Sequence, residues 1–117
     1  GNLDLLRTNA TYADDETFVY IYKNHFFTTW SGLEVYDITK ANRVYHYQVT
    51  HKKYGVTTNI DSFLIFLSDD KSYRGKKTKI AIHNIGEETD DFLQPFFQTV
   101  AQEFPNVAVG YENNRPF

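Results

Sequence analysis

The chain has 117 residues, enough for one domain with a single core and too few for two ordinary domains. Its 12 basic and 15 acidic side chains give a formal charge of −3, which argues against a surface that binds nucleic acid over its whole area. The lack of cysteine excludes disulfides, thiolate metal sites and a cysteine nucleophile. No apolar run approaches the roughly 18 residues that a membrane-spanning helix needs.

The first half of the chain predicts strands and turns. After a polar lead-in at residues 1–16, the β-branched and aromatic runs at 17–22 and 26–30 predict a hairpin that turns at "KNH". Residues 33–38 alternate, and "TKAN" marks the next turn. Residues 43–55 predict a long strand with a period of two. Its two faces are about equally aromatic and polar, so the pattern does not decide which face is buried.

Two further strands are predicted before the only helix. Residues 61–68 contain a near-continuous apolar run, short enough for a strand that is buried on both faces. A charged connector with Gly75 leads to an alternating strand at 78–85, in which Ile80 and Ile82 share a face. We expect these two strands to form a charged hairpin.

One amphipathic helix is predicted at residues 91–104. Thr89, Asp90 and Asp91 offer an N-cap and place negative charge at the positive end of the helix dipole. Pro95 then lies within about the first turn, where proline is tolerated. A wide apolar stripe must be buried against a large apolar surface; it consists of Phe92, Leu93, Phe96, Phe97, Val100, Ala101 and Phe104. We expect burial against the apolar strand, specifically of Phe92, Phe96, Phe97, Val100 and Phe104 against Phe63, Ile65 or Phe66 and their neighbours.

A sheet-rich body with one late helix predicts a β-rich α+β fold. We expect a curled antiparallel sheet or an open barrel, with the helix packed on it. Pro105 ends the helix, and residues 106–112 predict a short strand or extended segment. The domain would cover residues 17–112 and leave a tail at 113–117.

The order of these segments resembles the pleckstrin-homology-like domains found in bacteria. A strand ending at Asp37 and Ile38 leads to a long strand, two further strands carry an apolar run, and a C-terminal helix plugs the sheet. The resemblance covers residues 17–104, and the segment after the helix departs from it. It implies a binding or scaffolding role without catalysis or a cofactor, toward a protein partner or an anionic membrane surface. One interpretation is the soluble part of a membrane-attached protein whose anchor lies outside this sequence.

No motif predicts an enzyme, so we expect no catalytic, cofactor or metal residues. The histidines His25, His46, His51 and His83 have no ligand spacing such as HExxH, and neither GxSxG nor GxxxxGK[ST] occurs. Residues 78–109 also resemble the ending of deaminase-like bacterial toxins, but the cysteine and HxE zinc motifs of that chemistry are missing.

Two alternatives stay open beside the interaction module. A small toxin-type enzyme domain would need His46 or His51 in a cleft beside Lys52 and a carboxylate. An acidic immunity-type inhibitor would instead bind a basic protein. No nucleic acid partner is expected for the leading interpretation.

The strongest outward-pointing signal is a basic cluster around Gly75. Strand alternation places two of its lysines on one face, and each exposed cation near an anionic membrane contributes about 1 kcal/mol. The other interpretation is a solvated hairpin whose lysines protect sheet edges. The predicted anionic-surface contacts are Lys71, Arg74, Lys76, Lys77 and Lys79.

Overall fold

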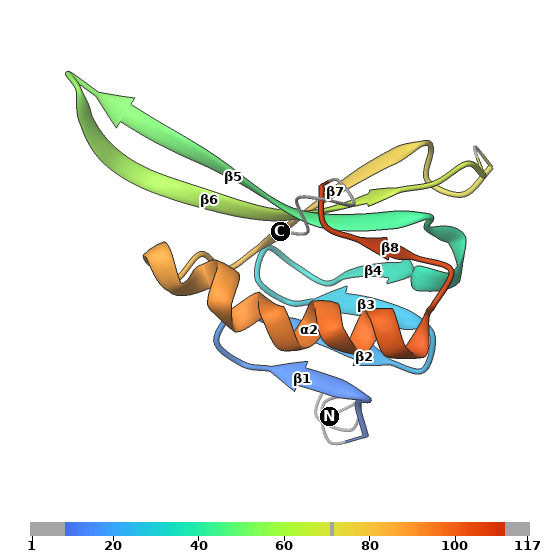
Figure 1. Ribbon diagram of the computed structural model, residues 1–117. Coiled ribbons are helices and arrows are strands. Elements are labelled where there is room, and N and C mark those ends of the chain that lie inside the picture. The colour runs from blue at the N-terminus through green and yellow to red at the C-terminus, as the bar shows by residue number, and fades with distance from the viewer. Residues whose placement is uncertain (1–8, 71, 112–117) are drawn as a thin grey trace.

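The computed structural model describes residues 9–70 and 72–111, whose strands form two four-stranded sheets (Figure 1). The first sheet is antiparallel and contains β1 (Tyr12–Asp14), β2 (Val19–Tyr22), β3 (His25–Thr28) and β4 (Glu34–Asp37) in that order. The second sheet has the order β7-β6-β5-β8, from β7 (Lys77–Ile82), β6 (Val56–Leu67), β5 (Arg43–Lys53) and β8 (Ala108–Val109). The helical elements are η1 (Ile38–Lys40), η2 (Gly86–Glu88) and α2 (Thr89–Glu103). The predicted β-rich α+β class is confirmed, and the described strands do not close into a barrel.

The two predicted hairpins are present, and a third, longer hairpin was not predicted. β2 pairs with β3 and β6 pairs with β7, both antiparallel. β6 begins at Val56, well before the apolar run, and pairs along almost all of β5 with one irregularity between His51 and Lys52. The turn between them is Tyr54–Gly55. β5 and β6 therefore form one long hairpin, whose far half extends beyond the rest of the second sheet (Figure 1).

The sheets have two short edge strands, of which β1 was not predicted. β1 lies within the predicted lead-in and pairs with β2, and the ring of Tyr12 contacts that of Phe96 edge-on at 5.9 Å. β8 lies in the segment after the helix that was predicted as a short strand or extended segment, and its parallel pairing with β5 was not predicted. Arg43 fixes this end because its Nη1 donates a hydrogen bond to the Gly110 carbonyl at 2.6 Å. The predicted tail at 113–117 lies outside the described residues.

Helix α2 packs on the core between the two sheets, as predicted (Figure 1). Its buried apolar residues are Leu93, Phe96, Phe97 and Val100, which follow the i, i+3, i+4, i+7 spacing of one helix face. The Phe96 ring meets Phe26 of β3 at 6.0 Å, and Phe26 meets Phe66 of β6 at 5.3 Å. The helix is thus joined to both sheets through a series of aromatic ring contacts, one edge-on and one tilted.

Three residues of the helix stripe are less buried than predicted. Phe92 is 38% exposed, Ala101 is exposed and Phe104 is only partly buried, because a stripe seven residues wide exceeds the face that one helix can bury. On β6, strand alternation turns Phe66 and its neighbour Leu64 toward the helix, in agreement with the prediction, whereas Phe63 and the buried Ile65 lie on the outer side of the second sheet. Of the three expected partners of the helix, Phe66 alone belongs to this core.

The start of the helix also differs from the prediction. α2 begins at Thr89 after Glu88, which forms no capping bond through its side chain. Thr89 Oγ1 accepts from the Ile85 N–H at 2.9 Å and donates to the Gly86 carbonyl, so it braces the preceding turn. Pro95 consequently lies inside the helix rather than in its first turn. A proline there costs about 3 kcal/mol, which the burial of the apolar face outweighs.

Candidate functional site

The structure separates the members of the predicted basic cluster. Lys71 lies outside the described residues. Arg74 turns back toward β4, where its Nη1 donates to the Val35 carbonyl at 2.5 Å and its Nη2 pairs with Glu34 at 3.2 Å. Lys76 is exposed just before β7. The arginine is therefore engaged within the fold.

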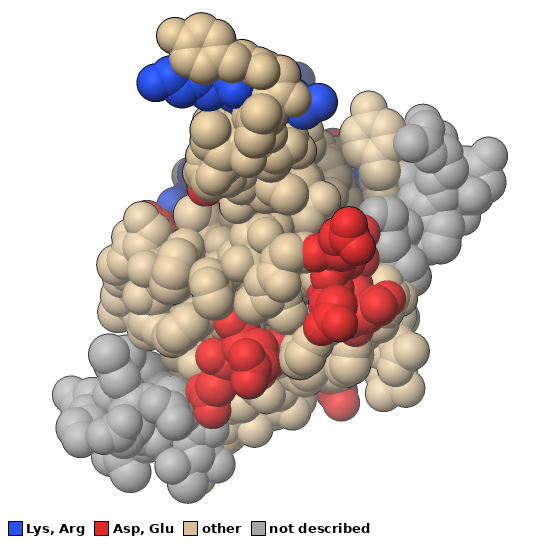
Figure 2. Space-filling view, turned by 90° about the vertical axis from the view of Figure 1, so that its left-hand side faces the viewer, with Lys and Arg blue, Asp and Glu red and all other residues tan. Residues whose placement is uncertain are grey.

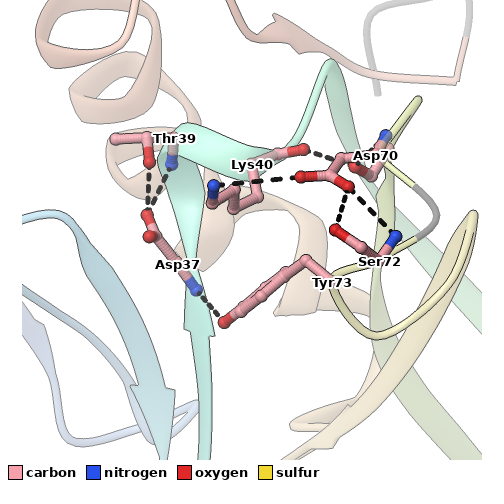
Figure 3. A network of polar contacts seen from close by, with 7 residues as sticks. Asp37, Thr39, Lys40, Asp70, Ser72 and Tyr73 are labelled. Atoms are coloured by element: carbon pink, nitrogen blue, oxygen red, sulfur yellow. Dashed lines mark hydrogen bonds and ion pairs between the residues drawn. The ribbon is translucent and has the colours of Figure 1, made fainter.

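A polar network fixes the connection between β6 and β7 to the corner between β4 and η1 (Figure 3). Ser72 donates to Asp70 Oδ1 from its backbone N–H at 3.0 Å and from its hydroxyl, and these bonds lower the pKa of the Asp70 carboxyl, with Lys40 at 3.8 Å adding to the effect. The Tyr73 hydroxyl accepts from the Asp37 N–H at 2.8 Å. The polar side chains of this connection thus serve the fold, which leaves the lysines of β7 as the better candidates for an external contact.

Lys77 and Lys79 lie on the outer side of the second sheet. Both are exposed and alternate with the buried Thr78 and Ile80, as strand geometry predicts. Together with residues of β5, β6 and the chain end they line a groove of about 450 Å³, which we call the outer-face groove: Tyr45, Tyr47, Ile65, Lys77, Lys79 and Tyr111.

Aromatic contacts shape the outer-face groove. The rings of Tyr45 and Tyr111 meet edge-on at 5.2 Å, and Tyr47 faces Phe63 at 6.4 Å. The Lys79 ammonium lies over the Phe63 ring, 4.5 Å from its centroid. This contact leaves the cation on the protein surface with an aromatic support. Sheet pairing sets these side chains together, because Tyr45 is opposite Ile65 and Ile65 is opposite Lys79.

The groove is suited to non-catalytic binding of an anionic group. Two ammonium groups supply point charges with several donors each, and phenol hydroxyls can donate further hydrogen bonds. Sequence reasoning identified Lys77 and Lys79 but missed the tyrosines. The sequence does place Tyr45 and Tyr47 on one face of a period-two strand. Which face points outward depends on the side of the sheet on which the helix packs, and the sequence pattern does not show that side.

A second polar arrangement lies under the helix start. His46 Nδ1 is hydrogen-bonded to Asp90, and its Nε2 lies 2.9 Å from Ser62 Oγ, to which Asn84 Nδ2 also donates at 2.7 Å. The order carboxylate, imidazole, hydroxyl is that of a serine hydrolase relay. Ser62 is only 1% exposed, however, so a substrate does not reach its hydroxyl in this conformation. The arrangement instead links β5, β6 and α2.

The remaining histidines lie apart from this network. His51 pairs with Asp61 at 2.8 Å on the exposed half of the long hairpin, and His83 stacks on Trp30 with ring centroids 4.2 Å apart. His25 is exposed in β3. Within the described ranges, no group of three or more potential ligand residues could hold a metal ion. His51 and Lys52 are both exposed neighbours in the sequence, which is not the enclosed site that the toxin-type alternative needs.

Comparisons of the chain with protein-family models, with curated proteins and with solved structures find no match. In the part of the chain that the structure describes, no helix is long and apolar enough to cross a membrane.

Proposed function

We propose that this chain is a non-catalytic, pleckstrin-homology-like interaction module that binds an anionic membrane surface through the outer-face groove. The order of its elements supports the resemblance, because β4 ends at Asp37, Ile38 begins a short turn into the long β5, and β6, β7 and a core-packed helix follow. The parallel strand β8 is an addition to that pattern.

The observation that carries the proposal is that Lys77 and Lys79 share one groove with tyrosine side chains. Helix α2, with Asp90 and Asp91 in its first turn, lies on the inner side of the same sheet. The lysines therefore face outward on the side away from this negative charge. A negatively charged surface would be attracted to the outer face even though the whole chain is acidic.

Binding to lipid vesicles tests this function. The protein should cosediment with phosphatidylcholine vesicles that contain phosphatidylserine and remain free with phosphatidylcholine alone. Binding should weaken steeply from low to physiological ionic strength, where the screening length is about 8 Å. The double substitution Lys77→Glu and Lys79→Glu should abolish binding and leave unfolding by denaturant unchanged, since both side chains are exposed.

A matched control is available at the far end of the long hairpin. Lys52→Glu with Lys53→Glu changes the net charge by the same amount at exposed positions outside the groove. This variant should keep its vesicle binding. Equal losses in the two double variants would show a nonspecific response to net charge, and a wild-type protein that ignores anionic vesicles at low salt would refute the membrane contact.

A further inference from the structure

The far half of the β5–β6 hairpin projects from the body as an arm (Figure 1). We define the arm as residues 47–61, where most side chains of both strands are exposed. In the described chain, β7 pairs with β6 only as far as Ser62 and β8 pairs with β5 only as far as Val44. The arm is thus a two-stranded ribbon, which is marginally stable by itself in water.

The arm tip combines apolar and basic side chains, Lys52, Lys53, Tyr54 and Val56. Tyr54 is 94% exposed and Val56 is 66% exposed. The turn has positive φ at both central residues, 54° at Tyr54 and 78° at Gly55. Such turns favour Asn-Gly, because a bulky side chain is strained in the left-handed region. The turn geometry therefore does not explain a tyrosine here.

Three other described non-glycine residues have positive φ: Lys23, at 55°, is exposed between β2 and β3 with its ammonium 5.4 Å from the centroid of the Tyr22 ring, whereas the other two make contacts within the fold. Phe18, at 60°, packs against the rings of Trp30 and His83, and Arg74, at 54°, binds two groups of the β4 region. Tyr54 has its ring near the neighbouring ammonium of Lys53, with 5.7 Å between nitrogen and centroid. This local contact leaves almost the whole ring in water. A contact outside the molecule would account for the side chain.

A pocket with complementary chemistry lies between β1 and the first half of α2. Its volume is about 450 Å³, and Phe92, which is partly exposed, forms part of its lining. The walls are mainly apolar and include two carboxylates. We call this the helix–β1 pocket; it is lined by Tyr12, Ala13, Asp14, Asp91, Phe92 and Pro95.

Charge is distributed unevenly between these two surfaces. Lys and Arg side chains gather on the projecting hairpin, and Asp and Glu side chains gather on the body below it (Figure 2). Near the pocket, the structure gives Glu87, Glu88 and Asp91 no ion pair with any described residue. The arm tip and the pocket region therefore carry opposite charges that the fold itself does not compensate.

We propose that the arm tip of one molecule docks in the helix–β1 pocket of a second copy of this chain. Tyr54 then enters the pocket beside Phe92 and Pro95, and the two lysines of the tip face the two pocket carboxylates. This contact goes beyond the proposed membrane function and uses different residues.

A second copy is the partner that the structure supplies, because both complementary surfaces occur on the same chain. The β5–β6 ladder holds the tip away from its own body (Figures 1 and 2). The contact joins two different surfaces, so repetition produces a ring or an open chain of molecules. A single hairpin tip is a small interface, and we expect weak association that salt suppresses.

Sedimentation equilibrium of the whole chain tests this contact. At low salt the average mass should rise as the protein concentration approaches the order of 1 mM, and it should return toward the monomer at high salt. Lys52→Glu with Lys53→Glu should remain monomeric, and so should Glu88→Lys with Asp91→Lys. Mixing the two variants should restore association, because each then carries the charge that the other needs.

Two further variants separate association from folding and from membrane binding. Tyr54→Asn restores the preferred turn, so it should keep or raise the unfolding midpoint while association is lost. Lys77→Glu with Lys79→Glu changes the outer-face groove and should associate as the wild type does. The proposal is overturned by a wild-type protein that stays monomeric near 1 mM, by a tip variant that still associates, or by a mixture that stays monomeric. Loss of vesicle binding in the tip variant, with the wild type monomeric, would identify the tip as a lipid contact instead.

Discussion

The two halves of the β5–β6 hairpin belong to one antiparallel ladder and have different surroundings. Near the body, Val44, Leu64 and Phe66 are fully buried against the helix and the first sheet. In the arm, Thr50 and Thr58 lie on strands of the same ladder and are exposed. This difference shows that backbone pairing alone does not determine whether the side chain of a strand residue is buried or exposed. Packing constrains the side chains of one half, and solvent or a partner acts on those of the other.

The largest expected effect is in the packed half of the molecule. Phe96→Ala removes the ring that joins the helix to β1 and β3, and it should lower the free energy of unfolding by about 3–5 kcal/mol. Denaturant unfolding measures this loss. Val56→Ala in the arm is the control and should change stability by less than about 0.5 kcal/mol. A loss below about 1 kcal/mol at Phe96 would contradict its place in the core.

Alkaline pH should lower the free energy of unfolding, and Tyr12 should account for part of this loss. Burial, with a smaller effect of Asp14, raises the pKa of Tyr12 to about 12, and burial also raises the pKa of Tyr36. The neutral phenol is favoured in the folded state, so this stability is complete below pH ~10 and is lost as pH rises through about 12. Allowing for the partial exposure of Tyr12, its share is at most about 2 kcal/mol.

Unfolding measured at pH values on either side of this range tests the assignment. Tyr12→Phe should reduce the alkaline loss because it removes the titrating group and keeps the ring contact with Phe96. Tyr54→Phe, in the exposed arm tip, should leave that loss as it is in the wild type. The same pH dependence in the wild type and in Tyr12→Phe would show that other groups cause it.

Ser62 lies where the packed half meets the arm, and its replacement should have an intermediate effect. Ser62→Ala leaves buried donors or acceptors of His46 and Asn84 without this partner, which should cost about 1–3 kcal/mol. Thermal or denaturant unfolding provides the readout. Thr58→Ala in the arm also removes a hydroxyl that donates to the backbone, at the His51 carbonyl, but in an exposed setting. Equal effects at the two positions would show that the buried network does not stabilise the fold.

The smallest expected effects are in the arm. Val56→Thr should alter the free energy of unfolding by no more than about 0.5 kcal/mol, because the side chain is exposed. Hydrogen exchange should show faster exchange of paired amides in the arm than at Leu64 and Phe66, where opening exposes the core. Equal protection of the two regions in dilute solution would show that the arm opens as rarely as the body, and it would contradict the expected difference in local stability.

The sequence predicted those features that depend on local periodicity. The helix and its buried residues Leu93, Phe96, Phe97 and Val100 followed from one repeating pattern, and the turns marked two of the hairpins. Phe92 was misplaced because the pattern shows which residues are apolar but not how much surface the opposing sheet offers.

The features that escaped prediction depend on distant contacts. β1 is short and is defined by its pairing with β2, and the parallel pairing of β8 with β5 could not be predicted from the segment itself. The hydrogen bond between His46 and Asp90 spans 44 residues of sequence, and no spacing rule connects them. The candidate site contains one example of each kind. Lys77 and Lys79 were predicted from a cluster of charges in the sequence, whereas Tyr45 lies beside them only because of the register of β5, β6 and β7.

The parallel pairing of β8 with β5 has a consequence for the order of folding. The hydrogen bond from Arg43 to Gly110 closes a loop of 67 residues, whereas the β5–β6 and β6–β7 hairpins close over short turns. Bringing distant segments together costs more chain entropy and slows the step that requires it. We therefore expect the meander of β5, β6 and β7 to form early and β8 to dock last. The second sheet is therefore complete only after helix α2 has packed on the core, because β8 follows that helix in the sequence and pairs with β5, the first strand of the sheet.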